Sequence, residues 1–439
     1  MTLPQNMDYF DRAEALSRDE IEALQLERLK HVVEIASRSP FYQERLAEAG
    51  VTADSIKSLD DVRRIPYTTK DDLRGQYPYG LTTVPTDELV RLHASSGTTG
   101  APTVIFHTQA DLDQWASLMA RSMFIAGVRP TDVFQNMAGY GLFTGGLGIH
   151  YGAERLGCLT IPAGAGNSKR QIKLIQDFNV SVLHIIPSYA LYLVTYLEKE
   201  GIDPKTLPVR IALIGAEPHT EEARLRIEEL LNVKAYNSYG LSEMNGPGVA
   251  FECVHQNGLH VWEDAFITEI VDPETFEPLP EGETGELVMT TLTRQGMPIL
   301  RYRTKDLTGF LPGDCPCGRE HRRLDRIKGR TDDMIIIKGV NIYPMQVEQV
   351  LLAIPEVGQN YLIELYSEGY IDQMRVKVEL KEEHFVEDMR ALGSIQKRIS
   401  SRLRDELLIT PRVELVQHNS LPQTEGKAQR VSDMRQEVS

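Results

Sequence analysis

Short apolar runs that alternate with helix-patterned segments constrain this 439-residue chain more than any other feature. Residues 181–186 and 210–215 have the length and apolar composition of buried strands, and residues 220–231 have the spacing of the helix that follows the second strand. Apolar strands separated by helices belong to parallel sheets. We therefore expect α/β architecture, with parallel α/β layers and loops at the strand ends.

The pattern changes twice further along the chain. From about residue 258 to residue 308, short alternating segments such as 266–271 and 285–289 predict a small β-barrel or sheet layer. Beyond residue 330, strand and helix patterns predict a compact α+β unit of about a hundred residues, which is a common domain size. We expect an N-terminal domain over residues 1–330 and a C-terminal domain over residues 331–439.

The charge balance and the start of the chain limit the partners and the location. The chain has 47 Lys and Arg against 63 Asp and Glu, a net charge of −16, which disfavours nucleic acid and anionic membranes as partners. The first residues form neither a basic region nor an apolar leader, and the apolar stretch 180–197 is interrupted by His184, Pro187 and Ser188. We expect a cytoplasmic protein that binds neither nucleic acid nor membrane.

A loop rich in glycine and hydroxyl groups follows an apolar strand near residue 92. Glycines let backbone N–H groups turn toward an anion, and serine and threonine add donors. The loop is not a Walker A motif, because the four-residue gap and the Lys-Ser/Thr pair are missing. It predicts a polyphosphate site, with an ordinary solvated turn as the alternative. Its residues are Ser95, Ser96, Gly97, Thr98, Thr99 and Gly100.

Later segments add single groups that suit a nucleotide. The segment 238–243 offers the flat ring of Tyr239 for a purine and the carboxylate of Glu243 for Mg²⁺. Asp306 ends a strand and can accept both ribose hydroxyls, and Lys427 lies on a glycine-bearing loop where it can reach a developing anion. Taken singly, each of these charges also fits an ordinary surface position.

Together and in this order, the segments resemble the adenylate-forming (acyl-CoA synthetase) superfamily, specifically its phenylacetate–CoA ligase family. The resemblance covers nearly the whole chain. Its motifs are Tyr140-Gly-Leu-Phe-Thr-Gly-Gly146, Tyr151-Gly-Ala-Glu-Arg-Leu-Gly157, Gly215-Ala-Glu-Pro218, Tyr239-Gly-Leu-Ser-Glu243 and Gly329-Arg-Thr-Asp-Asp333. It implies a homodimeric ligase that joins an aryl acid, with phenylacetate as the leading one, to coenzyme A. ATP and Mg²⁺ would be used, an acyl-adenylate formed, and AMP and pyrophosphate released.

The resemblance also implies roles for single residues. The loop at residues 95–100 would hold the ATP phosphates, Glu243 would bind Mg²⁺, and Lys427 would contact the carboxylate and the α-phosphate. Gly215, Ala216, Glu217, Tyr239 and Gly240 would frame the adenine, while Asp306 and Arg330 would hold the ribose. Tyr140, Phe143, Asn245, Gly246 and Pro247 would form the acid pocket, with core packing as the alternative for the two rings. Asp332 would be the hinge of a mobile C-terminal domain.

The chain departs from this family pattern at two positions. Ala101 stands where many relatives have lysine, so phosphate binding would rely on backbone and hydroxyl donors. Lys305 precedes Asp306, where the wider superfamily has glycine. Neither change removes a residue to which the resemblance assigns chemistry.

Three alternatives stay open at this point. The acid can be another aryl acid, such as indoleacetate, a hydroxybenzoate or anthranilate, because a few side chains set such specificity. The enzyme can be an adenylyltransferase that stops at AMP transfer, as the deazaflavin-adenylylating relatives do. The chain can also be a nucleotide- or acyl-CoA-binding protein without catalysis.

Four cysteines in 439 residues are too few for a disulfide scaffold. Cys315 and Cys317 flank a proline before a glycine, a turn that directs two thiolates to one side of a metal. With Cys253 and His260 they would make a closed structural Zn²⁺ site, with His255 and His321 as competing ligands. The alternative is that these groups lie in unrelated loops. Cys158 has no role that we can assign.

Overall fold

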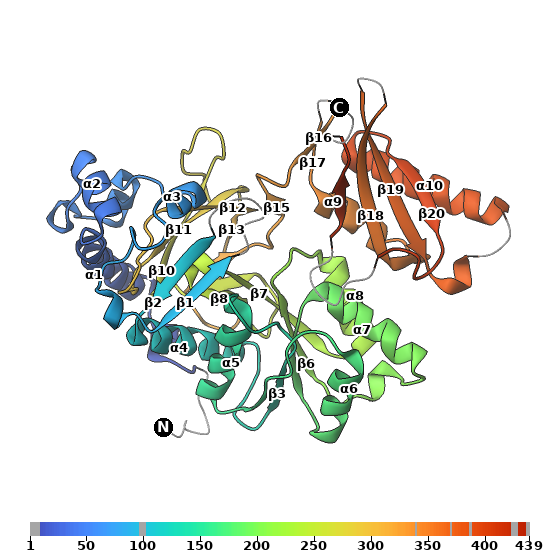
Figure 1. Cartoon of the computed structure of the whole chain (residues 1–439), viewed down its shortest axis with the longest axis horizontal. Helices are drawn as coiled ribbons and strands as arrows, with labels where there is room; N and C mark the ends of the chain where they lie inside the picture. Colours follow the sequence, from blue (N-terminus) through green and yellow to red (C-terminus); the bar gives the residue numbers. More distant parts are fainter. Residues whose placement is uncertain are drawn as a thin grey trace.

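A nine-stranded sheet with the order β13-β14-β9-β8-β7-β6-β5-β3-β4 forms the centre of the N-terminal part of the chain (Figure 1). The structure is a computed structural model, and it describes residues 9–95, 102–338, 340–368, 371–385, 389–422 and 429–435. The parallel strands are β3 (Val133–Asn136), β4 (Leu159–Ile161), β5 (Val182–Ile185), β6 (Ile211–Gly215) and β7 (Lys234–Leu241). The antiparallel extension consists of β8 (Gly246–Glu252), β9 (Leu259–Val261), β14 (Arg323–Leu324) and β13 (Phe310–Leu311).

Helices cover both faces of this sheet, which confirms the predicted α/β layers. Ile211 and Leu213 of β6 belong to one hydrophobic core, and Ala212 and Ile214 belong to another. Because successive strand residues point to opposite faces, the strand is buried on both sides. The first core includes α4 (Gln109–Ile125) and α5 (Thr144–Leu156), and the second includes α6 (Ser168–Asp177), α7 (Pro187–Lys199) and α8 (Glu221–Leu231).

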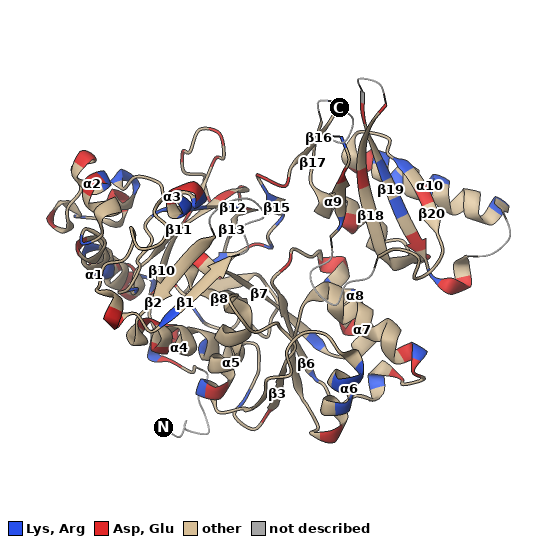
Figure 2. Cartoon of the chain, viewed as in Figure 1, with Lys and Arg blue, Asp and Glu red and all other residues tan. Residues whose placement is uncertain are grey.

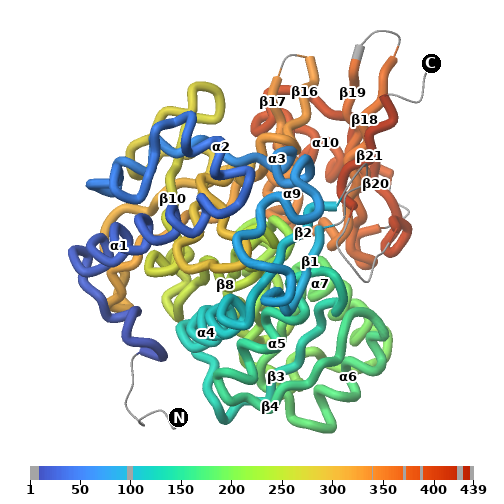
Figure 3. The backbone as a smooth tube through the Cα atoms, turned by 60° about the vertical axis from the view of Figure 1, so that its left-hand side comes forward, coloured from blue at the N-terminus to red at the C-terminus, as the bar shows by residue number. Residues whose placement is uncertain are grey.

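The predicted β-rich layer is a second sheet with the order β10-β11-β12-β15, whose described strands form an open antiparallel sheet. Its strands are β10 (Phe266–Val271), β11 (Gly285–Thr291), β12 (Tyr302–Thr308) and β15 (Gly329–Arg330). The helices α1 (Arg18–Ala36), α2 (Pro40–Glu48) and α3 (Lys70–Gly75) lie beside it (Figure 3). Gln25 of α1 connects these helices with the second sheet, because its side-chain amide donates to the Phe266 carbonyl of β10 at 3.0 Å.

Short elements connect these layers. The strands β1 (Arg91–Ser95) and β2 (Thr103–His107) pair antiparallel on either side of the predicted phosphate loop. Short 3-10 helices are η1 (Arg12–Ala15), η2 (Ala53–Ser55), η3 (Leu59–Arg64), η4 (Thr86–Glu88), η5 (Pro204–Thr206), η6 (Ser242–Met244) and η7 (Glu382–His384).

The C-terminal part is a separate α+β domain with its own hydrophobic core (Figures 1 and 3). Its sheet has the order β20-β19-β18-β21, and a hairpin of β16 and β17 precedes it. The strands are β16 (Ile335–Ile337), β17 (Val340–Ile342), β18 (Val357–Glu368), β19 (Ile371–Leu380), β20 (Arg412–Val416) and β21 (Val431–Asp433). The helices α9 (Pro344–Leu352) and α10 (Met389–Leu407) supply Val347, Leu351, Ile399 and Leu403 to the core.

Charges of both signs are distributed over both domains (Figure 2). Much of the net charge of −16 nevertheless comes from one segment, because residues 235–293 contain 11 Asp and Glu and no Lys or Arg. Within the described ranges, no helix has the length and apolar character needed to cross a membrane.

The contact between α4 and α5 depends on a glycine and gives a test of the fold. A Cβ added at Gly152 of α5 would lie 2.4 Å from Cγ of Met119, whereas one added at Gly145 of the same helix meets nothing within 4 Å. We expect Gly152→Ala to lower the free energy of unfolding by about 1–3 kcal/mol through overpacking. Gly145→Ala is the matched control, and it should be neutral or stabilising by up to about 1 kcal/mol. Denaturant unfolding measures both, and equal stability of the two variants would contradict this packing.

Candidate functional site

Asp306, on β12, is a buried carboxylate with a donor on each oxygen. Arg330 Nη1 donates to one oxygen at 2.8 Å, and the Tyr239 hydroxyl donates to the other at 2.6 Å. Burial raises the pKa of Asp306 to about 6, although the Arg330 charge and both hydrogen bonds act in the opposite direction. Hydroxyl groups of a ligand can take the place of these donors.

The sheet brings the predicted ribose pair together. β15 pairs with β12 so that Arg330 lies directly opposite Asp306. The same guanidinium donates to both carboxylate oxygens of Asp332, at 2.9 and 3.1 Å. One arginine therefore connects the predicted ribose residue with the predicted hinge residue.

The residues predicted to frame the adenine lie on two neighbouring parallel strands. Gly215 ends β6 opposite Ser238 of β7, and a Cβ at Gly215 would lie 2.3 Å from the Ser238 hydroxyl oxygen. Gly240 is equally constrained, because its Cβ would lie 1.9 Å from the Gly246 carbonyl oxygen. Only glycine allows these close approaches. Glu217 follows β6, and its carboxylate accepts a hydrogen bond from the Ser188 backbone N–H.

Three non-glycine residues beside the predicted site have backbone angles that favour glycine. Their φ values are +68° at Ala216, +68° at Lys305 and +77° at Asn245. Lys305 directly precedes Asp306, and its positive φ gives a conformational reason for the glycine expected at this position in the wider superfamily. Strained backbone of this kind persists where the surrounding structure fixes the chain, and it is common at ligand sites.

Glu243 lies on η6 and is held at both its side chain and its main chain. The Tyr302 hydroxyl donates to its carboxylate at 3.1 Å, and Arg294 Nη1 donates to its carbonyl at 2.8 Å. Arg294 is 1% exposed, and its Nη2 donates to the Phe106 carbonyl at 3.1 Å. It has no ion pair with any residue in the described ranges.

Arg294 and Tyr302 were not among the residues predicted from the sequence. Arg294 follows an apolar strand, where an arginine ordinarily indicates a surface charge. Tyr302 precedes the recognised Asp306 on the same strand, but nothing in the sequence says that its hydroxyl meets Glu243. Burial raises the Tyr302 pKa well above its ordinary value, so this hydroxyl remains a donor.

The predicted acid-pocket residues come from two adjacent segments. Tyr140 and Phe143 precede α5, and the Tyr140 hydroxyl accepts a hydrogen bond from Asn136 Nδ2 at 3.0 Å. The segment with Asn245, Gly246 and Pro247 packs against the start of α5, since a Cβ at Gly246 would lie 2.4 Å from Thr144 Cβ. The Trp115 indole fixes this segment by donating to the Pro247 carbonyl at 2.8 Å.

Several predicted residues lie outside the described ranges. They are Ser96, Gly97, Thr98, Thr99 and Gly100 of the phosphate loop, and Lys427. Ser95 is described: it ends β1, and its hydroxyl oxygen is buried with no hydrogen-bond partner among the described residues.

The four residues predicted to bind zinc form one cluster. The ligand atoms of Cys253, His260, Cys315 and Cys317 all lie within 4.8 Å of one another. Cys253 follows β8, His260 lies on β9, and β9 pairs with β14 just beyond the two other cysteines. Strand pairing thus joins positions that are more than fifty residues apart in the chain.

The distances between the ligand atoms of this cluster suit an ion with tetrahedral coordination. The Sγ atoms of Cys253 and Cys315 are 3.6 Å apart, and Cys317 Sγ is 3.3 Å from His260 Nε2. Zinc–sulfur bonds of about 2.3 Å in a tetrahedron would give S···S separations of about 3.8 Å. His260 Nδ1 lies 3.2 Å from the His321 carbonyl, a contact that leaves Nε2 free for a metal.

His255 and His321, the two alternative metal ligands, do not lie in the cluster. His321 Nδ1 accepts from the Glu263 N–H at 3.1 Å, and its Nε2 lies 2.9 Å from the Ala13 carbonyl, so both ring nitrogens are engaged. His255 is exposed and does not belong to the cluster. His260 is the histidine that the fold supplies.

Comparison with known proteins assigns the family. Residues 11–293 match the AMP-binding enzyme family, and residues 339–435 match the AMP-binding enzyme C-terminal domain. The chain is 48% identical to a phenylacetate-coenzyme A ligase of Thermus thermophilus, over 98% of this chain and 100% of the relative. It is 46% identical to the Pseudomonas putida phenylacetate-coenzyme A ligase and 45% identical to that of Escherichia coli, in each case over 97% of both chains.

Solved structures agree with this assignment. A 2-hydroxyisobutyryl-CoA ligase in the postadenylation state superimposes with a TM-score of 0.93 at 31% identity, covering 100% of this chain and 94% of that chain. The same ligase in the thioesterification state, with CoA, gives a TM-score of 0.74. The chain therefore belongs to the AMP-binding enzyme family, and within it to the phenylacetate–coenzyme A ligases.

Proposed function

We propose that this chain ligates an aryl acid, with phenylacetate as the leading candidate, to coenzyme A through an acyl-adenylate, releasing AMP and pyrophosphate. The main support is sequence similarity: the chain is 44–48% identical to four phenylacetate-coenzyme A ligases, over at least 96% of its length. The convergence of Tyr239, Asp306 and Arg330 supports it, because these groups suit a nucleoside.

The reaction has two steps with different requirements. A carboxylate is a poor acyl donor because its leaving group would be oxide. In the first step a carboxylate oxygen attacks the α-phosphorus of ATP, the new C–O–P bond forms, and the bond to pyrophosphate breaks. In the second step the thiol sulfur attacks the acyl carbon, the C–S bond forms, AMP leaves with the bridging oxygen, and the thiol proton passes to solvent. The AMP group makes the second step feasible because it leaves readily.

In this proposal each group of residues binds a different part of ATP. Asp306 and Arg330 hold the ribose, and the segments at 215–217 and 239–240 frame the adenine. The loop at 95–100 holds the phosphates. Glu243 would hold Mg²⁺, which neutralises phosphate charge when bound. Lys427 would offset the charge that develops at the α-phosphate.

We also propose the division of the chain into an adenylation domain, residues 1–330, and a mobile domain, residues 331–439, that carries Lys427 and rotates at Asp332. One site has to release pyrophosphate and then admit a thiol, so its lining has to change between the steps. A homodimer is the expectation from the family resemblance, and the mass of the purified chain in solution measures it.

A product assay tests the proposed function. We expect purified chain with ATP, Mg²⁺ and phenylacetate to release pyrophosphate and, with CoA present, to form phenylacetyl-CoA detectable by mass spectrometry. Lys427→Ala should slow pyrophosphate release by about a hundredfold while thioester formation from supplied phenylacetyl-AMP continues. AMP transfer without a thioester would indicate the adenylyltransferase alternative, and ATP binding without turnover would indicate the binding protein.

A panel of acids in the same assay determines the specificity. It contains phenylacetate, indoleacetate, 4-hydroxybenzoate, anthranilate and the aliphatic 2-hydroxyisobutyrate. We expect the highest kcat/KM with phenylacetate. A higher value for 2-hydroxyisobutyrate would overturn the aryl-acid assignment.

The Asp306 carboxyl predicts how ATP binding depends on pH. Burial raises its pKa to about 6, so at pH 5 only about a tenth of the free enzyme carries the carboxylate that accepts the ribose hydroxyls. We expect KM for ATP to rise about tenfold from pH 8 to pH 5, because binding must first remove a proton. In Asp306→Asn, KM for ATP should be higher at pH 8 and nearly independent of pH. An unchanged pH profile in this variant would contradict the ribose role.

We further propose that Cys253, His260, Cys315 and Cys317 bind one structural Zn²⁺. Three sulfurs and one nitrogen at tetrahedral spacing fit this ion, and four protein ligands leave no open coordination position. The site would join β8, β9 and the loop before β14, and it would act on stability rather than on the reaction.

Metal analysis and thermal unfolding test the zinc site. We expect about one zinc per chain after purification without added metal, and loss of that zinc in Cys315→Ser. The variant should unfold at a temperature lower by about 5 °C or more. Cys158→Ser is the matched control, because Cys158 lies apart from the cluster, with its thiol directed at the Arg129 carbonyl. A zinc-free wild type that unfolds at the same temperature as Cys315→Ser would refute the site.

A further inference from the structure

The two domains are held in one of several arrangements known for a related ligase. Two postadenylation structures of the 2-hydroxyisobutyryl-CoA ligase, each with an acyl-AMP, superimpose on this chain with TM-scores of 0.93 and 0.94. Its thioesterification state and its open conformation, both with CoA, give 0.74. The chain is thus arranged more like the two postadenylation structures than like the two structures with CoA. The contacts between the domains in this chain therefore belong to the postadenylation arrangement.

Helix α8 of the large domain supplies a cation to these contacts. Arg226 Nη2 donates to the Val357 carbonyl at 3.1 Å, and its Nη1 donates toward the Gly358 carbonyl at 3.3 Å. Both carbonyls lie at the start of β18 in the small domain. Arg226 is partly buried, and no ion pair with a described carboxylate competes for its guanidinium. Its hydrogen-bonding capacity is directed at the other domain.

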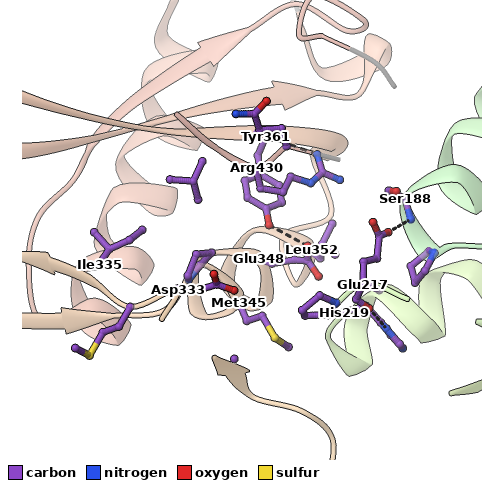
Figure 4. Close-up of a pocket in the computed structure, with 18 of the residues that line it drawn as sticks. Ser188, Glu217, His219, Asp333, Ile335, Met345, Glu348, Leu352, Tyr361 and Arg430 are labelled. Carbon is purple, nitrogen blue, oxygen red and sulfur yellow. Dashed lines mark hydrogen bonds between the residues drawn. The ribbon is translucent and has the colours of Figure 1, made fainter. Parts of the chain in front are cut away.

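The small domain places the carboxyl group of Glu348 at the start of the same helix. Glu348 of α9 accepts a hydrogen bond from the Thr220 N–H at 3.3 Å, and Thr220 is the N-cap of α8. Its second oxygen accepts from the Tyr361 hydroxyl at 2.9 Å. A carboxyl group is favoured at a helix N-terminus, where backbone N–H groups lack partners. Figure 4 shows Glu348 and Tyr361 facing Glu217 and His219 across the cavity of about 480 Å³ between the domains.

A third contact lies on α7. The Thr195 hydroxyl donates to the side-chain carbonyl of Gln359 at 3.3 Å, one residue beyond the carbonyls that Arg226 binds. Three residues of the large domain thus meet one edge of the small domain. We call Arg226, Glu348 and their partners the α8 clasp.

We propose that Arg226 and Glu348 are positioning residues that hold the small domain in the postadenylation arrangement, and that the α8 clasp must open before the thiol can attack. Only the expected effect on the two half-reactions rests on the proposed function; the placement of the small domain does not. Glu348 faces the predicted adenine residue Glu217 across the cavity, but neither Arg226 nor Glu348 hydrogen-bonds to Asp306 or Arg330. The clasp therefore acts on these two residues through the placement of the small domain.

Crosslinking measures the arrangement without any turnover. In Thr195→Cys/Gln359→Cys the new thiols replace two side chains whose ends are in contact, so a short bifunctional thiol reagent should join them. We expect Arg226→Ala in this background to slow the crosslinking at least twofold, because losing two charge-assisted hydrogen bonds shifts a two-state equilibrium by about tenfold. Leu225→Ala, a change at an exposed neighbour on α8, is the matched control and should leave the rate unchanged. An Arg226→Ala rate equal to that of the control would overturn the clasp.

Half-reaction kinetics then test the consequence. Arg226→Ala should slow acyl-AMP formation, followed as pyrophosphate release, by about two- to tenfold. Thioester formation from supplied acyl-AMP and CoA should be unchanged or faster, and Arg226→Lys should recover part of the first step. Equal losses in both half-reactions would mean that Arg226 only stabilises the fold, and would refute the positioning role. Glu348→Gln gives an independent variant with the same expected split.

The two proposals fail in different ways. A wild-type chain that makes neither acyl-AMP nor thioester would refute the proposed function, while the crosslinking result would still decide whether the clasp exists. A wild-type chain with full activity and crosslinking that ignores Arg226 would refute the clasp alone.

Discussion

The ion pair between Asp306 and Arg330 is the interaction on which the rest of the site depends. A carboxylate buried in the protein is costly unless it is paired and hydrogen-bonded, and here one guanidinium and the Tyr239 hydroxyl satisfy it. The same guanidinium binds both oxygens of Asp332, where the chain passes into the small domain. The proposed ribose residue Asp306 and the proposed hinge residue Asp332 therefore share one side chain. A ribose that displaces Arg330 from Asp306 would also change the restraint on the junction.

Parallel strands explain why the candidate site lies at this place. β6 ends at Gly215 opposite Ser238, and β7 continues beyond it to Leu241, so Gly215 and the segment after Ser238 lie at the carboxyl edge of the sheet, the usual position of ligands in open α/β sheets. Backbone strain at Ala216, Lys305 and Asn245 surrounds that edge. The two hydrophobic cores on either side of the sheet hold these loops in conformations that they would not adopt alone.

The sequence predicted the parts of this structure that local pattern determines. Residues 210–215 were predicted to be a buried strand, and β6 covers Ile211–Gly215. The spacing of Cys315 and Cys317 indicated a turn suited to a metal, and the two residues do lie in one cluster with Cys253 and His260. The pairing of β9 with β14 that selects His260 over His321 is tertiary, and no local signal carries it. Arg294, Tyr302 and Arg226 were missed for the same reason. Arg294 and Arg226 bind main-chain carbonyls, which every residue has, and Tyr302 meets a carboxylate 59 residues away in the chain.

Oxygen labelling shows whether the acid is activated as an adenylate. Phenylacetate carrying ¹⁸O in both carboxylate oxygens is incubated with the enzyme, ATP, Mg²⁺ and CoA, and the AMP is analysed by mass spectrometry. Because AMP leaves with the bridging oxygen, we expect one ¹⁸O in the AMP phosphate and one in the thioester carbonyl. Thioester formed together with AMP that contains no label would contradict it.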